Sequence, residues 1–311
     1  MKKAVSLFLC LLLLLSFSGC KIDSVPNPNS GKLSIITTSF PPYDFARAIG
    51  GEFTSVTMLL PPGQESHTFE PTPQDMIALS GADLIIAGGG TSDEWMKKLI
   101  SSSELDKEKV LFMMDCVETK EAETDSHAHG HSYFYEYDEH VWTSPKNAQK
   151  ICKAILERLI TIDKENAAFY EENAAAYSKQ LKQLDEEFRS FFKMSSLDTL
   201  IFADRFPFRY FADEYGLAYF AAFPGCAGET EPDAATMKML IDKVNVENIP
   251  AVFYTELSNQ KIADTILEST TAKKLLLHSC HTVTKDEFER GETYISLMKQ
   301  NLANLKEALI P

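Results

Sequence analysis

Short apolar, β-branched runs alternate with amphipathic helical patterns along most of the chain. Four candidate strands lie near residues 34, 55, 84 and 110. The same alternation returns after residue 197, in the runs LDTLIFA, GLAYFAAF, PAVFYTE and KKLLLH. Strands that alternate with helices are typical of a parallel sheet covered by helices. We therefore predict an α/β fold with two parallel-sheet lobes, at residues 33–160 and 197–311.

Between the two predicted lobes, apolar residues recur at alternating spacings of four and three. They are Tyr170, Ala174, Tyr177, Leu181, Leu184, Phe188 and Phe191. This spacing places them on one face of a helix. About thirty residues at 1.5 Å each give a helix of roughly 45 Å, long enough to pack along both lobes. We predict one long, rigid linking helix at residues 161–196 that limits hinge closure between the lobes.

The amino terminus has the layout of a signal peptide. Two lysines stand ahead of an apolar run at residues 4–15. The run is too short to cross a bilayer as a helix, and small residues follow it. We predict a signal peptide at residues 1–19 and export from the cytoplasm.

Cys20 follows two small residues, as in the lipobox of bacterial lipoproteins, where the cysteine is lipidated and becomes the mature amino terminus. Phe17 stands where leucine is usual, so an ordinary secreted protein is the alternative. Residues 20–32 carry two prolines and no apolar periodicity, which predicts a tether behind the lipid anchor. The expected location is extracytoplasmic, on the cell membrane.

The 311 residues favour two domains, and 44% hydrophobic with 24% charged residues is the composition of an ordinary globular protein. The formal net charge is −15. Such a surface repels nucleic acid and mildly concentrates cations. We expect no nucleic-acid partner, and a monomer.

Four cysteines remain when the two near the amino terminus are set aside: Cys116, Cys152, Cys226 and Cys280. An even number in an oxidising compartment suggests disulfides, and four cysteines allow three pairings. If the lobes fold separately, Cys116 with Cys152 and Cys226 with Cys280 keeps each bridge within one lobe. The alternative is that Cys280, which stands between two histidines, is a thiolate metal ligand.

The seven histidines are confined to three places in the sequence. They are His67, then His127, His129, His131 and His140, and finally His278 and His281. Neutral imidazole is the commonest protein ligand for zinc, and histidines gathered at separated points of a chain can assemble an irregular metal site. The distribution predicts a metal-binding protein.

Several stretches, taken in order, resemble the zinc- and manganese-binding proteins of bacterial ABC importers, the cluster A-I substrate-binding proteins. They are SFPPYDFARAIGG, PPGQESHTFEPTPQDM, GADLIIAGGG, DEHVWTSPKNA, FRYFADEYGL and TYISLMKQNLANLKEAL. The likeness covers residues 35–309. It implies two α/β lobes joined by a long helix, a metal ion in the cleft between the lobes, and delivery of that ion to an ABC permease in the membrane.

The resemblance implies metal ligands at His67 and His140, which match the first two ligand positions of the family. The third, a histidine or glutamate, falls on Arg205, and arginine cannot bind a cation. The fourth, usually a carboxylate, falls on or beside His278.

A site of His67, His140 and His278 would leave one position of a four-coordinate zinc ion to water. His281 or Asp204 could complete a set of four protein ligands. A histidine-rich set favours zinc as the transported ion over manganese, which prefers oxygen ligands.

His127, His129 and His131 stand in an acidic segment, at about residues 121–137, whose composition cannot pack a core. The resemblance implies a histidine-rich loop that gathers metal near the cleft. A solvated spacer is the alternative.

Three other functions were weighed. Another divalent ion, manganese or iron, could be the ligand of the same kind of protein, or the chain could be an adhesin-like surface lipoprotein with incidental metal binding. A metallohydrolase would need a zinc-bound water beside a general base, and the sequence has no HExxH motif. We therefore expect no enzyme activity but a zinc-binding protein of an ABC importer.

Overall fold

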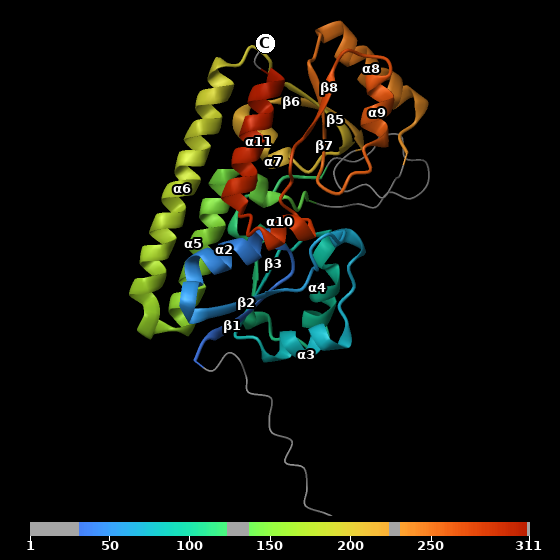
Figure 1. Cartoon of the computed structure of the whole chain (residues 1–311). Coiled ribbons are helices and arrows are strands. Elements are labelled where there is room, and N and C mark those ends of the chain that lie inside the picture. Colours follow the sequence, from blue (N-terminus) through green and yellow to red (C-terminus); the bar gives the residue numbers. More distant parts are fainter. Residues whose placement is uncertain (1–30, 123–136, 224–230, 310–311) are drawn as a thin grey trace, which may run out of the picture. The chain divides into compact units, whose positions relative to one another are not determined.

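The computed structural model describes residues 31–122, 137–223 and 231–309 (Figure 1). Within them, eight strands form two separate four-stranded sheets, and every strand pairing is parallel. The predicted fold class, two parallel-sheet α/β lobes with a long helix, is confirmed. Each of the eight strands overlaps one of the runs that the sequence pattern singles out.

The first sheet has the strand order β2-β1-β3-β4. Its strands are β1 (Leu33–Thr37), β2 (Thr54–Met58), β3 (Leu84–Ala87) and β4 (Val110–Phe112). Ile35 pairs with Val56 on one side and with Leu84 on the other. The order therefore reverses between β1 and β3. In open parallel sheets, ligands bind beyond the carboxyl ends of the strands at such a reversal.

The second sheet repeats this layout with the order β6-β5-β7-β8. Its strands are β5 (Thr199–Arg205), β6 (Ala218–Phe223), β7 (Ala251–Tyr254) and β8 (Lys273–Leu276). Phe202 pairs with Ala221 and with Phe253, so this order reverses between β5 and β7. Each lobe thus has its own reversal point.

Helices cover both faces of the sheets. The α-helices of the described residues are α2 (Phe40–Gly50), α3 (Pro73–Gly81), α4 (Glu94–Ser101), α5 (Pro145–Ile162), α6 (Ala167–Met194), α7 (Arg209–Tyr215), α8 (Ala234–Glu247), α9 (Lys261–Leu267), α10 (Lys285–Glu289) and α11 (Tyr294–Leu309). The 3-10 helices there are η1 (Gly51–Phe53), η2 (Ser66–Thr68), η3 (Thr91–Asp93), η4 (Lys107–Lys109), η5 (Met113–Cys116), η6 (Val141–Thr143) and η7 (Lys164–Asn166). One core cluster packs α3 and α4 on the first sheet, and another packs α8 and α9 on the second.

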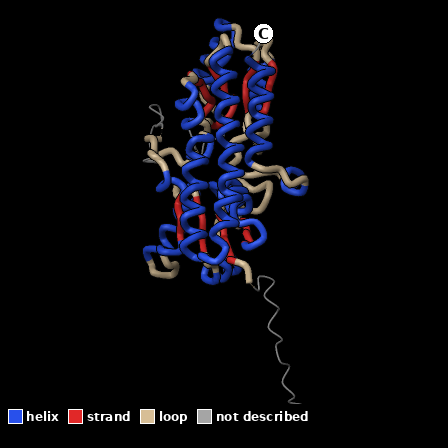
Figure 2. The backbone as a smooth tube through the Cα atoms, turned by 90° about the vertical axis from the view of Figure 1, so that its left-hand side faces the viewer, coloured by secondary structure: helices blue, strands red, loops and turns tan. Residues whose placement is uncertain are grey.

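The third and largest core cluster runs through both lobes along α6. It includes Ile35 and Leu84 of the first sheet and Phe202 and Phe253 of the second. All seven apolar residues of the predicted stripe are buried in it. The long helices α5, α6 and α11 run along this core (Figure 2). Both lobes therefore share one core along α6.

The linking helix starts later than the sequence pattern predicts. α5 continues to Ile162 and η7 intervenes, so α6 begins at Ala167. Asp163 makes this turn: its carboxylate accepts hydrogen bonds from Tyr170 Oη and Asn166 Nδ2, both at 2.7 Å. Among the described residues no helix, α6 included, is long and apolar enough to cross a membrane.

Capped helix starts fix two long connecting segments of the chain. Ser144 caps α5 by accepting a hydrogen bond from Asn147 N, and Pro145 occupies the first turn, where a missing N–H costs nothing. Thr284 and Glu287 form a capping box at the start of α10. The segment before α5 and the segment between β8 and α10 therefore enter their helices in fixed directions.

The expected bridge between Cys116 and Cys152 does not form. The thiols of Cys116, Cys152 and Cys280 are all free. Cys116 Sγ lies 3.4 Å from Phe112 O, and Cys152 lies in the large core. Burial raises the pKa of both thiols, which keeps them protonated and unreactive. The free thiol of Cys280 also leaves the expected bridge to Cys226 unformed, and Cys226 itself lies outside the described residues.

Candidate metal site

Four potential metal ligands converge at one point: His67, Glu139, His140 and His281. One ligand atom from each lies within 4.8 Å of those of the other three. His67 is partly buried, and the other three are buried. The described residues hold no other group of this kind. Three imidazoles and one carboxylate match the ligands and the coordination number of zinc.

Each ligand is carried by a segment that follows the carboxyl end of a strand. His67 lies in η2, after β2. Glu139 and His140 lie directly before η6, between β4 and α5. His281 follows β8 in the second lobe, so three ligands come from the first lobe and one from the second. These segments follow edge strands, but the loops that follow β1 and β3, at the reversal of the first sheet, line the pocket beside Glu139 and His281.

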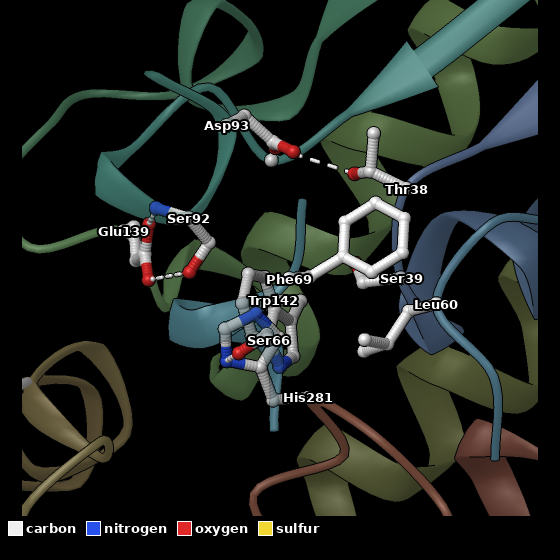
Figure 3. A pocket seen from close by; sticks show the side chains of 11 residues that line it. Thr38, Ser39, Leu60, Ser66, Phe69, Ser92, Asp93, Glu139, Trp142 and His281 are labelled. Carbon is white, nitrogen blue, oxygen red and sulfur yellow. Dashed lines mark hydrogen bonds between the residues drawn. The ribbon is translucent and has the colours of Figure 1, made fainter. Parts of the chain in front are cut away.

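The three imidazoles face one another closely. The centroid of the His281 ring lies 5.5 Å from that of His67 and 5.4 Å from that of His140. Trp142 closes the inner side, with its ring centroid 4.8 Å from that of His281 (Figure 3). The surroundings of the cluster are therefore dry on the side of the core, where charge interactions are strong.

Glu139 is held by the loop that follows β3. Its carboxylate accepts hydrogen bonds from Ser92 N at 3.0 Å, Ser92 Oγ at 2.7 Å and Thr91 Oγ1 at 3.4 Å (Figure 3). Gly90 leaves room for it, because a Cβ atom at that position would lie 2.2 Å from Glu139 Oε2. The carboxylate is thus clamped against the first lobe.

Glu139 is ionised although it is buried. Burial opposes ionisation, but His67, His281, His140 and the bond from Ser92 outweigh it and lower the pKa of the carboxyl to about 2. Burial, with His140 and His67 nearby, lowers the pKa of His281 well below its usual value. Both shifts favour the forms that bind a cation, a carboxylate at Glu139 and a neutral imidazole at His281.

A cavity of about 60 Å³ adjoins the cluster and contains three of its ligands in its wall, His67, His140 and His281. Arg205 and Glu65 also line it. The guanidinium of Arg205 pairs with Glu65, with Nη1 3.4 Å from Oε2. Arg205, which the resemblance sets at the third ligand position, therefore pairs with a carboxylate of the opposite lobe and is not part of the cluster.

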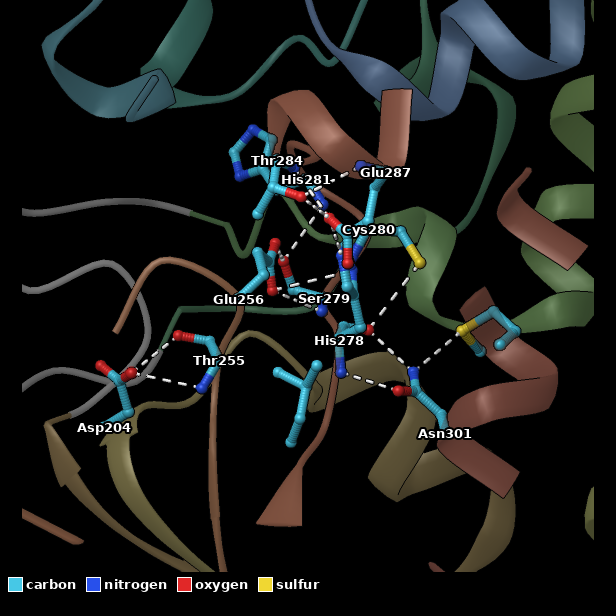
Figure 4. A network of polar contacts seen from close by, with 12 residues as sticks. Asp204, Thr255, Glu256, His278, Ser279, Cys280, His281, Thr284, Glu287 and Asn301 are labelled. Carbon is cyan, nitrogen blue, oxygen red and sulfur yellow. Dashed lines mark hydrogen bonds and ion pairs between the residues drawn. The ribbon is translucent and has the colours of Figure 1, made fainter. Parts of the chain in front are cut away.

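His278, which the sequence predicts as a ligand, lies outside the cluster. The loop that carries it takes part in a network of polar contacts within the second lobe, in which His278 is buried (Figure 4). His278 Nδ1 accepts a hydrogen bond from Cys280 N at 3.0 Å, and Nε2 lies 3.5 Å from Glu287 Oε2 without hydrogen-bond geometry. Asn301 binds the backbone N–H and C=O of His278 at 2.7 and 2.8 Å. Its imidazole therefore faces α10 and not the other ligands.

Asp204 is also outside the cluster. Its carboxylate accepts hydrogen bonds from Thr255 Oγ1 at 2.7 Å and Thr255 N at 3.3 Å (Figure 4). It therefore joins the ends of β5 and β7. The alternative that Cys280 is a thiolate ligand also fails, because its buried thiol is not in the cluster and burial raises its pKa. His127, His129 and His131 lie outside the described residues.

Sequence reasoning missed Glu139. Side chains of neighbouring residues in a strand point to opposite faces, so a carboxylate beside His140 is not expected to reach the same ion. The backbone at His140 is neither helical nor extended, with φ −79° and ψ 44°. This local bend turns both side chains to one point. The sequence signal was only the adjacency in DEHVW, and it does not specify the bend.

Comparison with known proteins points to one family. The family model described as zinc-uptake complex component A, periplasmic (ZnuA), matches residues 35–308. The chain is similar to the high-affinity zinc uptake system protein ZnuA of Bacillus subtilis, with 32% identity over 97% of this chain and 95% of that protein. It is 30% identical to the zinc-binding lipoprotein AdcA of Streptococcus pneumoniae over 98% of this chain and 61% of that longer protein.

A solved structure shows the same fold. The Zn(II)-bound ZnuA-like domain of Streptococcus pneumoniae AdcA superposes with a TM-score of 0.75 and 28% sequence identity. The match covers 90% of this chain and all of that domain. The arrangement of two parallel-sheet lobes around a long helix is therefore that of zinc-bound relatives.

Proposed function

Because this chain belongs to the ZnuA family of periplasmic zinc-uptake components, we propose that it captures a zinc ion outside the cytoplasm and delivers it to an ABC permease. The family consists of substrate-binding transport proteins, not enzymes. The observation that carries the proposal is the convergence of His67, Glu139, His140 and His281 at one point. No P-loop or HExxH motif in the sequence favours a different chemistry.

The donor set favours zinc. Zinc binds imidazole nitrogen and carboxylate oxygen in tetrahedral sites, and three imidazoles with one carboxylate fill four positions. Manganese prefers oxygen ligands, and this cluster offers oxygen only from Glu139. The ion is cargo, so the site must release it as well as bind it. One anionic ligand leaves the bound ion with a net positive charge, which limits the strength of binding.

The proposal is tested by metal content and competition. The purified chain should bind one zinc ion tightly, with manganese unable to displace it at comparable concentration. The double variant His67→Ala/His140→Ala should lose tight binding, measured by competition with a chromogenic chelator. Thr161→Ala, at an exposed hydroxyl on α5, is the matched control and should bind like the wild type. Full affinity in the double variant would refute this site.

The amino-terminal features complete the proposal. Lipidation of Cys20 after removal of residues 1–19 would anchor the chain outside the cytoplasm, and residues 20–32 would serve as the tether. Incorporation of labelled palmitate should occur in the wild type and disappear in Cys20→Ser. Sedimentation of the purified chain should give a monomer. Palmitate incorporation that persists in the variant would contradict the anchor.

The histidine-rich segment is proposed to gather metal and not to form the tight site. His127, His129 and His131 add three imidazoles beside acidic residues. Deletion of residues 126–132 should preserve one tight zinc ion per chain and remove only additional, weaker binding. Loss of the tight site in the deletion would show that this segment supplies a ligand.

A further inference from the structure

Each of the three clustered imidazoles has its Nδ1 atom against an oxygen atom of the first lobe. His140 Nδ1 lies 3.0 Å from Asp138 Oδ1, and His67 Nδ1 lies 3.1 Å from Ser92 Oγ. His281 Nδ1 lies 3.2 Å from Ser66 Oγ. Neutral imidazole carries one proton, on Nδ1 or on Nε2, and the hydrogen bond at one nitrogen decides which lone pair is left for a metal.

Asp138 settles the tautomer of His140. A carboxylate can only accept hydrogen bonds, and Oδ1 of Asp138 also accepts one from the backbone N–H of His140 at 2.8 Å. His140 Nδ1 therefore carries the proton, and its lone pair is on Nε2. This pairing of a carboxylate with a ligand histidine is common in metal sites. The two serines are less obvious, because a hydroxyl can donate or accept.

Ser92 has its single hydroxyl proton committed elsewhere. Its Oγ lies 2.7 Å from Glu139 Oε1, a short bond to an anionic acceptor that is stronger than a bond between neutral groups. The hydroxyl must then accept at its contact with His67, so His67 Nδ1 carries the proton. The distance of 3.5 Å between His67 Nδ1 and Glu139 Oε1 agrees, because a lone pair on Nδ1 would repel the carboxylate there.

Ser66 repeats this arrangement for the ligand from the second lobe. Its hydroxyl lies 3.5 Å from Glu65 Oε1, to which it can donate, and 3.2 Å from His281 Nδ1. Ser66 is buried, with 6% of its surface exposed. It stands next to His67 in η2, so one short segment supplies a ligand and orients another.

We propose that Ser92 is a positioning residue that sets the Nδ1–H tautomer of His67 and the rotamer of Glu139 together, with Ser66 acting likewise on His281. One hydroxyl then directs a nitrogen lone pair and a carboxylate oxygen to the same ion. The metal would bind the Nε2 atom of every imidazole. The proposal rests on the proposed function, since it takes these four residues as the ligands.

The test uses nitrogen NMR of the full chain labelled with ¹⁵N-histidine, first without metal. In the wild type, His67 should show a protonated Nδ1. In Ser92→Ala, this signal should weaken in favour of the other tautomer, and zinc affinity should fall by roughly 10- to 100-fold, the usual effect of losing such a partner. Ser92→Thr, which keeps a hydroxyl, should restore both. Ser101→Ala, at an exposed serine on α4, is the control.

Two outcomes would overturn the proposal: a protonated Nε2 on His67 in the wild type, or an unchanged tautomer and affinity in Ser92→Ala. Circular dichroism and urea unfolding of each variant separate misfolding from loss of orientation. The tautomer of His67 is measured without metal. Failure of the tautomer proposal can therefore be told apart from failure of the zinc-binding proposal. Wild-type protein with the expected tautomers but no tight zinc binding would refute the zinc function alone.

Discussion

The backbone N–H of Phe40, at the start of α2, donates a hydrogen bond to the carbonyl oxygen of His281 at 3.3 Å. A ligand of the second lobe is thereby tied to the first helix of the other lobe. Gly63 N donates to Val283 O at 2.7 Å in the same way, and Trp142 Nε1 donates to Ser279 O at 2.9 Å. Wide opening of the cleft would break all three bonds, so we expect metal exchange to use small local movements.

The first prediction concerns the indole of Trp142. Trp142→Phe keeps an aromatic ring but leaves the carbonyl of Ser279 without this donor, and an unsatisfied buried acceptor costs about 1–3 kcal/mol. The free energy of unfolding in urea should fall by that amount. Trp95→Phe is the matched control, because in the described structure its buried Nε1 has no hydrogen-bond partner. Equal losses in both variants would contradict the role of this bond.

The second prediction concerns the ligand that sequence reasoning missed. Glu139→Gln keeps the shape of the side chain and removes its charge, so zinc affinity should fall at least about 100-fold, or roughly 2.7 kcal/mol. Glu65→Gln, a neutralised carboxylate that lines the adjoining cavity outside the cluster, should change affinity much less. Chelator competition measures both. If Glu65→Gln lost more zinc affinity than Glu139→Gln, the carboxylate ligand would be Glu65.

The third prediction separates the two histidines of the last loop. His281→Ala removes a member of the cluster and should abolish tight zinc binding with little loss of fold stability. His278→Ala leaves all four clustered residues but removes the acceptor for Cys280 N, in a turn where Cys280 has φ +62°. It should mainly lower the free energy of unfolding, by about 1–3 kcal/mol. If His278→Ala cost more zinc affinity than His281→Ala, the cluster would be misidentified.

The fourth prediction is a limit on proton release. Metal binding releases protons from ligands, and from buried acids beside the ion, that are protonated in the free protein. The pKa of Glu139 is lowered to about 2 and that of His281 lies well below its usual value, which leaves His67 and His140 as the ligands that can release protons. Burial raises the pKa of Asp93 to about 6, so this neighbouring acid is also ionised well above that pH. Between about pH 7 and 8, zinc binding should therefore release at most two protons per ion.

Isothermal titration calorimetry in buffers of different ionisation enthalpy measures this number. The same limit applies to the pH dependence of affinity. The decimal logarithm of the zinc association constant should rise by no more than two for each pH unit. Release of three or more protons would show that His281 or Glu139 is protonated in the free protein.

The fifth prediction concerns Asp93, buried beside the site. Burial raises the pKa of this carboxyl from 3.8 to about 6. Hydrogen bonds from Gly89 N and Thr38 Oγ1 stabilise the anion and oppose this rise, but burial has the larger effect. The folded state then holds a proton that the unfolded state has lost, so this group makes stability fall as pH rises from about 4 to 6. The full loss is roughly 3 kcal/mol.

Asp93→Asn cannot ionise, so its stability relative to the wild type should improve as pH rises across that range. Urea unfolding at pH 4, 5, 6 and 7 measures the difference. Asp75→Asn, at a partly exposed acid in the capping box of α3, is the control and should give no such gain between pH 5 and 7. A constant difference for Asp93→Asn across the range would contradict the raised pKa.

Periodicity along the chain predicts the fold class, the approximate place of all eight strands and the buried face of the linking helix. These depend on local periodicity, since a strand buried on both faces is a run of apolar residues and a helix face repeats every three to four. His67 and His140 were expected from their motifs, and the structure places both in the cluster. The start of α6 was missed because the turn at Asp163 interrupts no apolar pattern.

The tertiary structure decided which residues share the metal site. Whether His278 or His281 enters the cluster depends on the turn at Cys280 and on the two hydrogen bonds between Asn301 and the backbone of His278. The positions of the histidines in the sequence do not reveal this turn or these bonds. Glu139 joins because of a bend at His140. A metal site is a convergence of side chains from separate segments, set by a few backbone angles and distant hydrogen bonds. Those angles leave no repeating pattern in the sequence, so only the folded chain specifies them.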